Sequence, residues 1–185
     1  MSSAPYVSRG GEKLAAALDH FGVAVGGLVC ADLGSHVGGF VDCLLRRGAI
    51  RVYSVDTSYG TLAWRLRRDP RVIVRERANA MHVNLPEAVD RVTIDVGWTR
   101  QRSILPNAAR LVRPGGEVVT LIKPHYEAPA ERLTGGVLPE KEAREVVEGV
   151  VAAMPAADWS LRGTMMSPIR GHGGNREWWA LLRRT

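Results

Sequence analysis

Short apolar runs alternate with stretches of helical periodicity along this chain. In residues 9–21 the apolar positions recur at the spacing of one helix face, whereas residues 28–33 form a continuous apolar run. A short continuous run of this kind is typical of a buried strand. The alternation continues to the end of the chain. It predicts helices over residues 38–47, 61–68, 103–112 and 139–154, and strands over residues 50–56, 72–75, 91–96, 116–122, 159–165 and 177–182.

Strands that alternate with helices indicate a three-layer α/β fold around a mostly parallel sheet. The last two predicted strands are joined by a glycine-rich loop instead of a helix, so we expect an antiparallel hairpin at one edge of the sheet. No repeat or linker interrupts residues 1–185, which predicts a single domain. Residues 132–138, which include Gly135 and Gly136, are the expected mobile loop.

Composition narrows the class of protein. The chain is 45% hydrophobic and 24% charged, which is typical of a folded globular domain. Its net charge of +6 suits a polyanionic partner such as nucleic acid, although many basic proteins have none. Cys30 and Cys43 fall in apolar segments, where we expect buried, reduced thiols. With no apolar stretch of membrane length and no secretory pattern at the N-terminus, the prediction is a soluble, cytoplasmic protein.

Lysine is rare in this chain. Only Lys13, Lys123 and Lys141 are lysines among 25 lysine and arginine residues. A lysine amine can lose its proton in a crowded site, whereas an arginine stays charged. Lys13 and Lys123 lie in polar segments next to predicted active-site loops, so they are candidates for proton chemistry. Codon usage and chance are the alternative explanation.

A glycine-rich loop follows the first predicted strand. Its candidate cofactor residues are Asp32, Gly34, Ser35, His36, Gly38, Gly39 and Phe40. Glycines there let the backbone approach a ligand at the carboxyl ends of the strands. The spacing is D-x-G-x-x-x-G-G, without the third glycine of a pyrophosphate-binding G-x-G-x-x-G loop. This favours S-adenosylmethionine (SAM) over a nicotinamide dinucleotide, and a Rossmann-like SAM-dependent methyltransferase fold over a dehydrogenase.

Two further residues extend the predicted cofactor site. Asp56 ends the second strand, 22 residues beyond Gly34, where a carboxylate accepts ribose hydroxyls. Asn79 follows the third strand and is a candidate contact for adenine. The alternatives are that Asp56 caps the next helix, that His36 only fills the turn, and that Asn79 is an ordinary surface residue.

Four charged residues are the candidate catalytic set: Lys13, Asp95, Lys123 and Glu177. Asp95 and Lys123 close predicted strands, Glu177 opens the last one, and Lys13 lies on the first helix. Charged groups at strand ends are costly to desolvate, which favours a function for them. Taken singly, each is better explained as an ordinary surface ion pair, whereas the order Lys–Asp–Lys–Glu of the four together is much more specific.

At these residues the chain resembles the FtsJ-type RNA ribose 2′-O-methyltransferases, most closely their TlyA (hemolysin A) branch. The resembling segments are residues 6–14 (YVSRGGEKL), 38–45 (GGFVDCLL), 62–64 (LAW), 69–72 (DPRV), 121–124 (LIKP), 167–169 (SPI) and 174–175 (GN). The resemblance implies a Lys-Asp-Lys-Glu catalytic tetrad at the four residues above and ribosomal RNA as substrate. It also implies SAM contacts at Gly38, Phe40, Asp56 and Asp95. We expect no metal ion, because the five histidines and two cysteines show no ligand spacing.

Three features depart from the family pattern. Residues 35–37 replace small and hydroxyl residues in the cofactor loop, and Gly97-Trp98 replaces a Ser-Phe pair. The usual N-terminal RNA-binding module has no counterpart in the few residues before residue 6. We therefore expect that RNA binds to the basic surface, that a protein partner delivers it, or that the substrate differs.

The resemblance predicts an in-line attack of a ribose 2′-oxygen on the SAM methyl group, with Lys123 as general base or as the cation that stabilises the alkoxide. Trp98, His125 and Tyr126 are candidates for stacking on a splayed base, with packing in the core as the favoured alternative for Trp98. For most of the arginines that are candidate phosphate contacts, a solvated helix face is the better explanation; the candidates are Arg9, Arg46, Arg47, Arg65, Arg67, Arg68 and Arg71. The competing functions are a non-catalytic SAM- or RNA-binding module in ribosome assembly, a small-molecule methyltransferase and, disfavoured by the loop spacing, an oxidoreductase.

Overall fold

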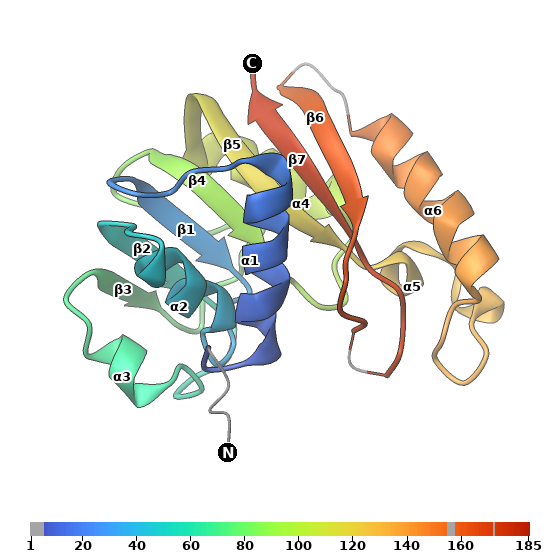
Figure 1. The fold of residues 1–185 in the computed structure, drawn as a ribbon, viewed down its shortest axis with the longest axis horizontal. Helices are drawn as coiled ribbons and strands as arrows, with labels where there is room; N and C mark the ends of the chain where they lie inside the picture. Colours follow the sequence, from blue (N-terminus) through green and yellow to red (C-terminus); the bar gives the residue numbers. More distant parts are fainter. Residues whose placement is uncertain (1–5, 155–157, 172) are drawn as a thin grey trace.

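The computed structural model describes residues 6–154, 158–171 and 173–185, and its elements alternate as the sequence predicts (Figure 1). The helices are α1 (Arg9–Phe21), α2 (Gly39–Arg46), α3 (Trp64–Arg67), α4 (Gln101–Leu111), α5 (Pro124–Glu127) and α6 (Glu140–Ala153), with a 3-10 turn η1 (Ala130–Arg132). The strands are β1 (Val29–Leu33), β2 (Arg51–Val55), β3 (Val72–Arg75), β4 (Val89–Ile94), β5 (Val112–Ile122), β6 (Trp159–Met166) and β7 (Trp178–Arg184).

The strands form one seven-stranded sheet in the order β3-β2-β1-β4-β5-β7-β6. The first five strands in that order run parallel, and β7 is antiparallel to both of its neighbours, β5 and β6. This confirms the mostly parallel sheet with an antiparallel C-terminal edge. The chain reverses its direction of travel across the sheet between β1 and β4, and ligands of open α/β sheets bind beyond the carboxyl ends of the strands at such a point.

Helices cover both faces of the sheet and create two hydrophobic cores. On one face, Leu14 and Leu18 of α1 pack with α2 and with the fully buried Trp179 of β7. On the other face, Ile104 of α4 and Val147 of α6 pack on the central strands. Cys30 and Cys43 are both buried and unpaired, as the sequence predicts. Since both faces are covered, ligand sites are left to the loops at the strand ends.

The ends of several elements differ from the prediction. Helix α3 is shorter than the predicted residues 61–68, because Thr61 and Ala63 instead bond back to the cofactor loop: the Thr61 hydroxyl donates to the His36 carbonyl, and the Ala63 N–H donates to the Val37 carbonyl. Strand β4 begins and ends two residues earlier than residues 91–96. The short helices α5 and η1 are absent from the prediction, since four and three residues show no periodicity.

Two expectations concern loops and ends of the chain. Residues 132–138, the expected mobile loop, contain η1's last residue and a turn in which Thr134 and Val137 exchange backbone hydrogen bonds. Residues 1–5, on which the expectation of a missing N-terminal module depends, lie outside the described residues. Among the residues that are described, no helix is long and apolar enough to cross a membrane.

Candidate active site

The glycine-rich loop begins where β1 ends. Gly34 has φ +92°, and a Cβ atom there would overlap the backbone carbonyl oxygen of Asp95 at the end of β4. Only glycine combines this positive φ with so close an approach. The loops after β1 and β4 are thereby held against each other, and they form the floor of a pocket.

This pocket, of about 410 Å³, opens at the carboxyl ends of the parallel strands. Its volume is within the range of small-molecule sites. The predicted cofactor residues that line it are Gly34, His36, Asp56, Asn79 and Asp95. The candidate catalytic residue Lys123 lines it as well. The pocket therefore joins the two sets of residues that the sequence analysis treats separately.

Asp56 presents a pre-oriented carboxylate to the pocket. One oxygen accepts a 2.7 Å hydrogen bond from the His36 backbone N–H, and the other accepts one of 2.7 Å from the Ser58 N–H. Partial burial by itself raises the pKa of Asp56, but the hydrogen bonds from Ser58 and His36 outweigh it, so the net pKa is lowered. Asp56 is therefore ionised at neutral pH, and each oxygen keeps a lone pair for a ligand hydroxyl.

Asp32 and Ser35 do not line the pocket; they lie beneath its floor. Oδ1 of Asp32 accepts a 2.8 Å hydrogen bond from the Thr93 hydroxyl, while Oδ2 is buried without a hydrogen-bond partner among the described residues. The Ser35 hydroxyl donates to the Asp32 backbone carbonyl at 3.0 Å. Burial, which the Thr93 bond only partly offsets, raises the pKa of Asp32 to about 7. These two residues support the loop from below.

Gly38, Gly39 and Phe40 are also not among the residues that line the pocket. A Cβ at Gly38 would overlap Leu66 of α3, and one at Gly39 would overlap Ser8, which caps α1. Phe40 is buried, with its ring centroid 5.6 Å from that of Trp179. The two glycines let α2 pack closely against its neighbours, so a direct contact of these three residues with a cofactor stays a prediction.

The four candidate catalytic side chains form two ion pairs. Nζ of Lys13, on α1, lies 2.6 Å from Oε2 of Glu177, which precedes β7. Nζ of Lys123, at the end of β5, lies 2.5 Å from Oδ1 of Asp95, just after β4. All four side chains are at most one quarter exposed. Exposed ion pairs contribute little to stability, and partly buried ones cost desolvation energy, so stability alone does not account for this cluster.

The two pairs affect each other electrostatically. Burial raises the pKa of Glu177 more than Lys13 and Lys123 lower it. For Lys123, burial lowers the pKa. The negative charges of Asp95 and then Glu177 raise it by more than burial lowers it, so the net pKa is above the ordinary 10.5. Lys123 is therefore an ammonium at neutral pH when no ligand is bound, and a role as a base requires that it first lose this proton.

A second pocket, of about 630 Å³, adjoins the first, and Trp98 lines both. Trp98 has φ +57°, is 88% exposed, and its ring centroid lies 4.8 Å from that of Tyr126. The Tyr126 ring also contacts His125, with 4.2 Å between the two ring centroids. Burial, and then the charges of Lys123 and Lys13, lower the pKa of His125, which is neutral at pH 7. The aromatic residues singled out in the sequence thus gather beside the four charges.

Sequence reasoning missed several residues that line the first pocket: Thr57, Ala78, Ala80, Met81, Thr99 and Ile104. All except Ile104 lie within a few residues of Asp56, Asn79 or Asp95, so their position next to a strand end is the signal that could have found them. Ile104 comes from α4 and carries no such signal. Within the described parts of the chain, no three His, Cys, Asp or Glu side chains gather closely enough to hold a metal ion.

Comparisons with known proteins agree on one family. Residues 6–184 match the family described as "FtsJ-like methyltransferase". "Putative rRNA methyltransferase YqxC" from Bacillus subtilis is 40% identical over 181 residues. "16S/23S rRNA (cytidine-2'-O)-methyltransferase TlyA" from Mycobacterium tuberculosis is 39% identical over 189 residues. The crystal structure of "a putative hemolysin from Lactococcus lactis" is 35% identical, with a TM-score of 0.93 over 98% of this chain and 89% of that one.

The relatives are longer than the region they share with this chain. The match covers 93% of this chain but 63% of the Bacillus protein, and 98% of this chain but 70% of the Mycobacterium protein. The activity and substrates of the whole relatives are therefore not carried over by similarity alone.

Proposed function

This chain belongs to the FtsJ-like methyltransferase family, and we propose that it transfers a methyl group from SAM to a ribose 2′-hydroxyl of RNA, with ribosomal RNA as the substrate. One observation carries the proposal: Lys13 with Glu177, and Lys123 with Asp95, meet in two ion pairs beside the pocket. Partly buried charges of this kind cost folding energy, and they cluster where chemistry requires them.

The pocket suits SAM in its shape and charge. Asp56 and Asp95 line it, Lys123 is already paired with Asp95, and among the described residues no arginine lines it, so it fits a sulfonium cation better than a pyrophosphate. The Asp56 carboxylate, held by two backbone N–H groups, would accept hydrogen bonds from the ribose hydroxyls. Asn79, Ala80 and Met81 would surround the adenine. When bound, SAM supplies an electrophilic methyl group.

Lys123 is the group that we assign to the ribose hydroxyl. In its neutral form, Nζ takes the proton of the 2′-hydroxyl and so makes the oxygen a stronger nucleophile. The ammonium that results is stabilised by Asp95, 2.5 Å away, and by Glu177. Lys13 holds Glu177 in place from α1 at 2.6 Å. The high pKa of Lys123 makes its neutral amine a strong proton acceptor, but it also means that only a small fraction of the molecules carry the neutral amine.

The second pocket is the proposed place of the target nucleotide. It borders Lys123 through His125 and Tyr126, and its aromatic rings are suited to stacking on an unpaired base. The net charge of +6 favours RNA over a neutral small molecule. Action on ribosomal RNA implies the cytoplasm, and a protein partner that delivers the RNA is compatible with this scheme.

The test is to incubate the protein with methyl-labelled SAM and unmodified ribosomal RNA, and to map the label to a nucleotide. We expect label on a ribose 2′-oxygen, which makes the adjacent phosphodiester bond resistant to alkali. Label on a base, or label only in a small-molecule fraction, would contradict the proposal. Tight SAM binding without transfer to any RNA would favour the non-catalytic module instead.

A further inference from the structure

We propose that a surface beside the SAM pocket binds a single-stranded stretch of RNA next to the methylated nucleotide. This aromatic–arginine surface consists of Tyr59, Trp64, Arg68 and Arg77. It lies in the loop after β2, in α3 and in the turn after β3, at the carboxyl end of the sheet (Figure 1). The inference rests on the proposed function, because it assigns the RNA path that leads to that site.

The first observation is exposure. Tyr59 and Trp64 are each 69% exposed, and together with Trp98 they are the strongly exposed aromatic side chains among the described residues. Leaving large aromatic rings in water forgoes the free energy that burial supplies. All three follow β2 or β4 at the end of the sheet where the pocket opens. Exposed aromatic rings next to a ligand site are what an unpaired base needs for stacking.

The second observation is the state of the nearby arginines. The guanidinium carbon of Arg77 lies 4.4 Å from the centre of the Tyr59 ring, and that of Arg68 lies 5.9 Å from the centre of the Trp64 ring. Within the described residues neither arginine forms an ion pair, although Arg65, Arg67 and Arg71 around them all do. Each ring is therefore next to a guanidinium that can meet a phosphate, and each is exposed enough to stack on a base.

The third observation is that this surface is held in a fixed shape. Glu76 accepts a 2.8 Å hydrogen bond from the Gly60 N–H and forms an ion pair with Arg67 of α3, so it ties the Tyr59 loop to the helix. Arg77 has φ +53°, which non-glycine residues rarely adopt unless the surroundings impose it. A preformed surface loses less conformational entropy on binding.

The surface adjoins the site in sequence. Thr57 lines the SAM pocket and Tyr59 follows two residues later. The pocket itself carries the carboxylates of Asp56 and Asp95, which repel a phosphate backbone. RNA that reaches Lys123 therefore needs cations outside the pocket, and Arg68 and Arg77 provide them. A stacking surface with cations selects unpaired strands, because duplex bases hide their faces.

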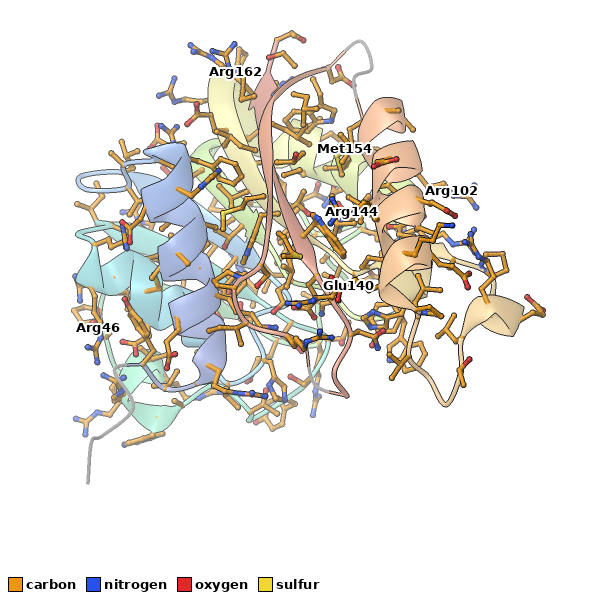
Figure 2. The ribbon with its side chains drawn as sticks, turned by 45° about the vertical axis from the view of Figure 1, so that its right-hand side comes forward. Arg46, Arg102, Glu140, Arg144, Met154 and Arg162 are labelled. Carbon is orange, nitrogen blue, oxygen red and sulfur yellow. The ribbon has the colours of Figure 1, made fainter. Side chains whose placement is uncertain are left out.

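The test measures binding of a fluorescein-labelled, unstructured oligoribonucleotide. We expect the double variant Tyr59→Ala/Trp64→Ala to bind about 5- to 150-fold more weakly per lost stacked base. Arg68→Gln/Arg77→Gln should lower the slope of log affinity against log salt by about 1.4. Exposed residues away from this surface give matched controls: Ile50→Ala, before β2, and Arg162→Gln, on β6 at the far end of the sheet (Figure 2). Melting temperature and SAM affinity should stay at wild-type values in all four variants.

Failure of this RNA-binding surface can be distinguished from failure of the proposed methyltransferase function. RNA binding that is equal in the wild type and both surface variants, or absent in all of them, would overturn the surface; a protein partner would then be its alternative occupant. If the variants lose RNA affinity while the wild type methylates no RNA, the surface stands and the methyltransferase proposal fails. If saturating RNA restores methyl transfer in the variants, both are supported.

Discussion

Lys123→Arg is the substitution that tests the proposed chemistry most directly. Arginine keeps the positive charge that pairs with Asp95, but its guanidinium does not give up a proton in a protein. If Nζ of Lys123 receives the proton of the ribose hydroxyl, the variant should fold, bind SAM and lose methyl transfer. The ion pair with Asp95, 2.5 Å long in the wild type, would remain available to the arginine.

The size of the effect follows from the raised pKa of Lys123. An amine whose pKa is 10.5 or higher is neutral in no more than about one molecule in a thousand at pH 7.5. The neutral fraction then grows about tenfold for each unit of pH, so the single-turnover rate of the wild type should rise with a logarithmic slope close to one between about pH 6.5 and 8.5. Removal of the base should lower the rate by about 10²- to 10⁴-fold.

The assay is single-turnover transfer of labelled methyl groups to RNA, with SAM affinity measured by calorimetry. Lys141→Arg is the matched control, because Lys141 is an exposed lysine on α6 and should tolerate the change. A Lys123→Arg rate within tenfold of the wild type, together with a rate that is flat with pH, would refute the reasoning. Lys123 would then act as a fixed cation that stabilises the alkoxide.

Three further predictions concern the pocket. Asp56→Asn should weaken SAM binding by about 10- to 100-fold in calorimetry, through loss of charge-assisted hydrogen bonds, and should also lower the melting temperature, because an amide has a single oxygen for the two backbone N–H groups whose hydrogen bonds the carboxylate accepts. Gly34→Ala should destabilise by more than about 2 kcal/mol in denaturant titrations, because its Cβ would overlap the Asp95 carbonyl; Gly22→Ala, at a positive φ with open space, should cost only about 1 kcal/mol. Burial raises the pKa of Asp32 from 3.8 to about 7. Between these two pH values the folded protein keeps a proton on Asp32 that the unfolded chain has lost. Stability should therefore fall between about pH 4 and pH 7 by up to about 1.4 kcal/mol per pH unit and level off above pH 7, and Asp32→Asn should make this slope shallower; equal slopes in the variant and the wild type would contradict this cause.

Most of the fold is predictable because the apolar residues of each helix and strand recur at the spacing typical of that element. The apolar run before Gly34 and the run that forms β3 were found within one residue of their ends. Helix α3 was overestimated, since residues 61–63 have helical composition but bond to the cofactor loop instead. Tertiary hydrogen bonds overrode local propensity there, and no local pattern records them.

The candidate site was predictable to the extent that polar residues at strand ends converge in a parallel sheet. This rule found Asp56, Asp95 and Lys123, which all line one pocket. Gly39 and Phe40 follow a strand as well, but they pack against α1 and β7, and their contact with a cofactor stays a prediction. The glycine motif is the same for contact with a ligand and for close packing of helices, so sequence alone did not separate the two.

The sequence by itself determined the order of strands and helices, the residue types at the strand ends, and the choice of lysine over arginine at two positions. Tertiary structure alone decided that β7 inserts between β5 and β6, which brings Glu177 within 2.6 Å of Lys13, 164 residues away in the chain. It also decided which acid meets which amine, and therefore the direction of each pKa shift. The reason is that periodicity acts over a few neighbouring residues, whereas burial and Coulomb energies depend on distances in space between segments that the chain itself keeps far apart.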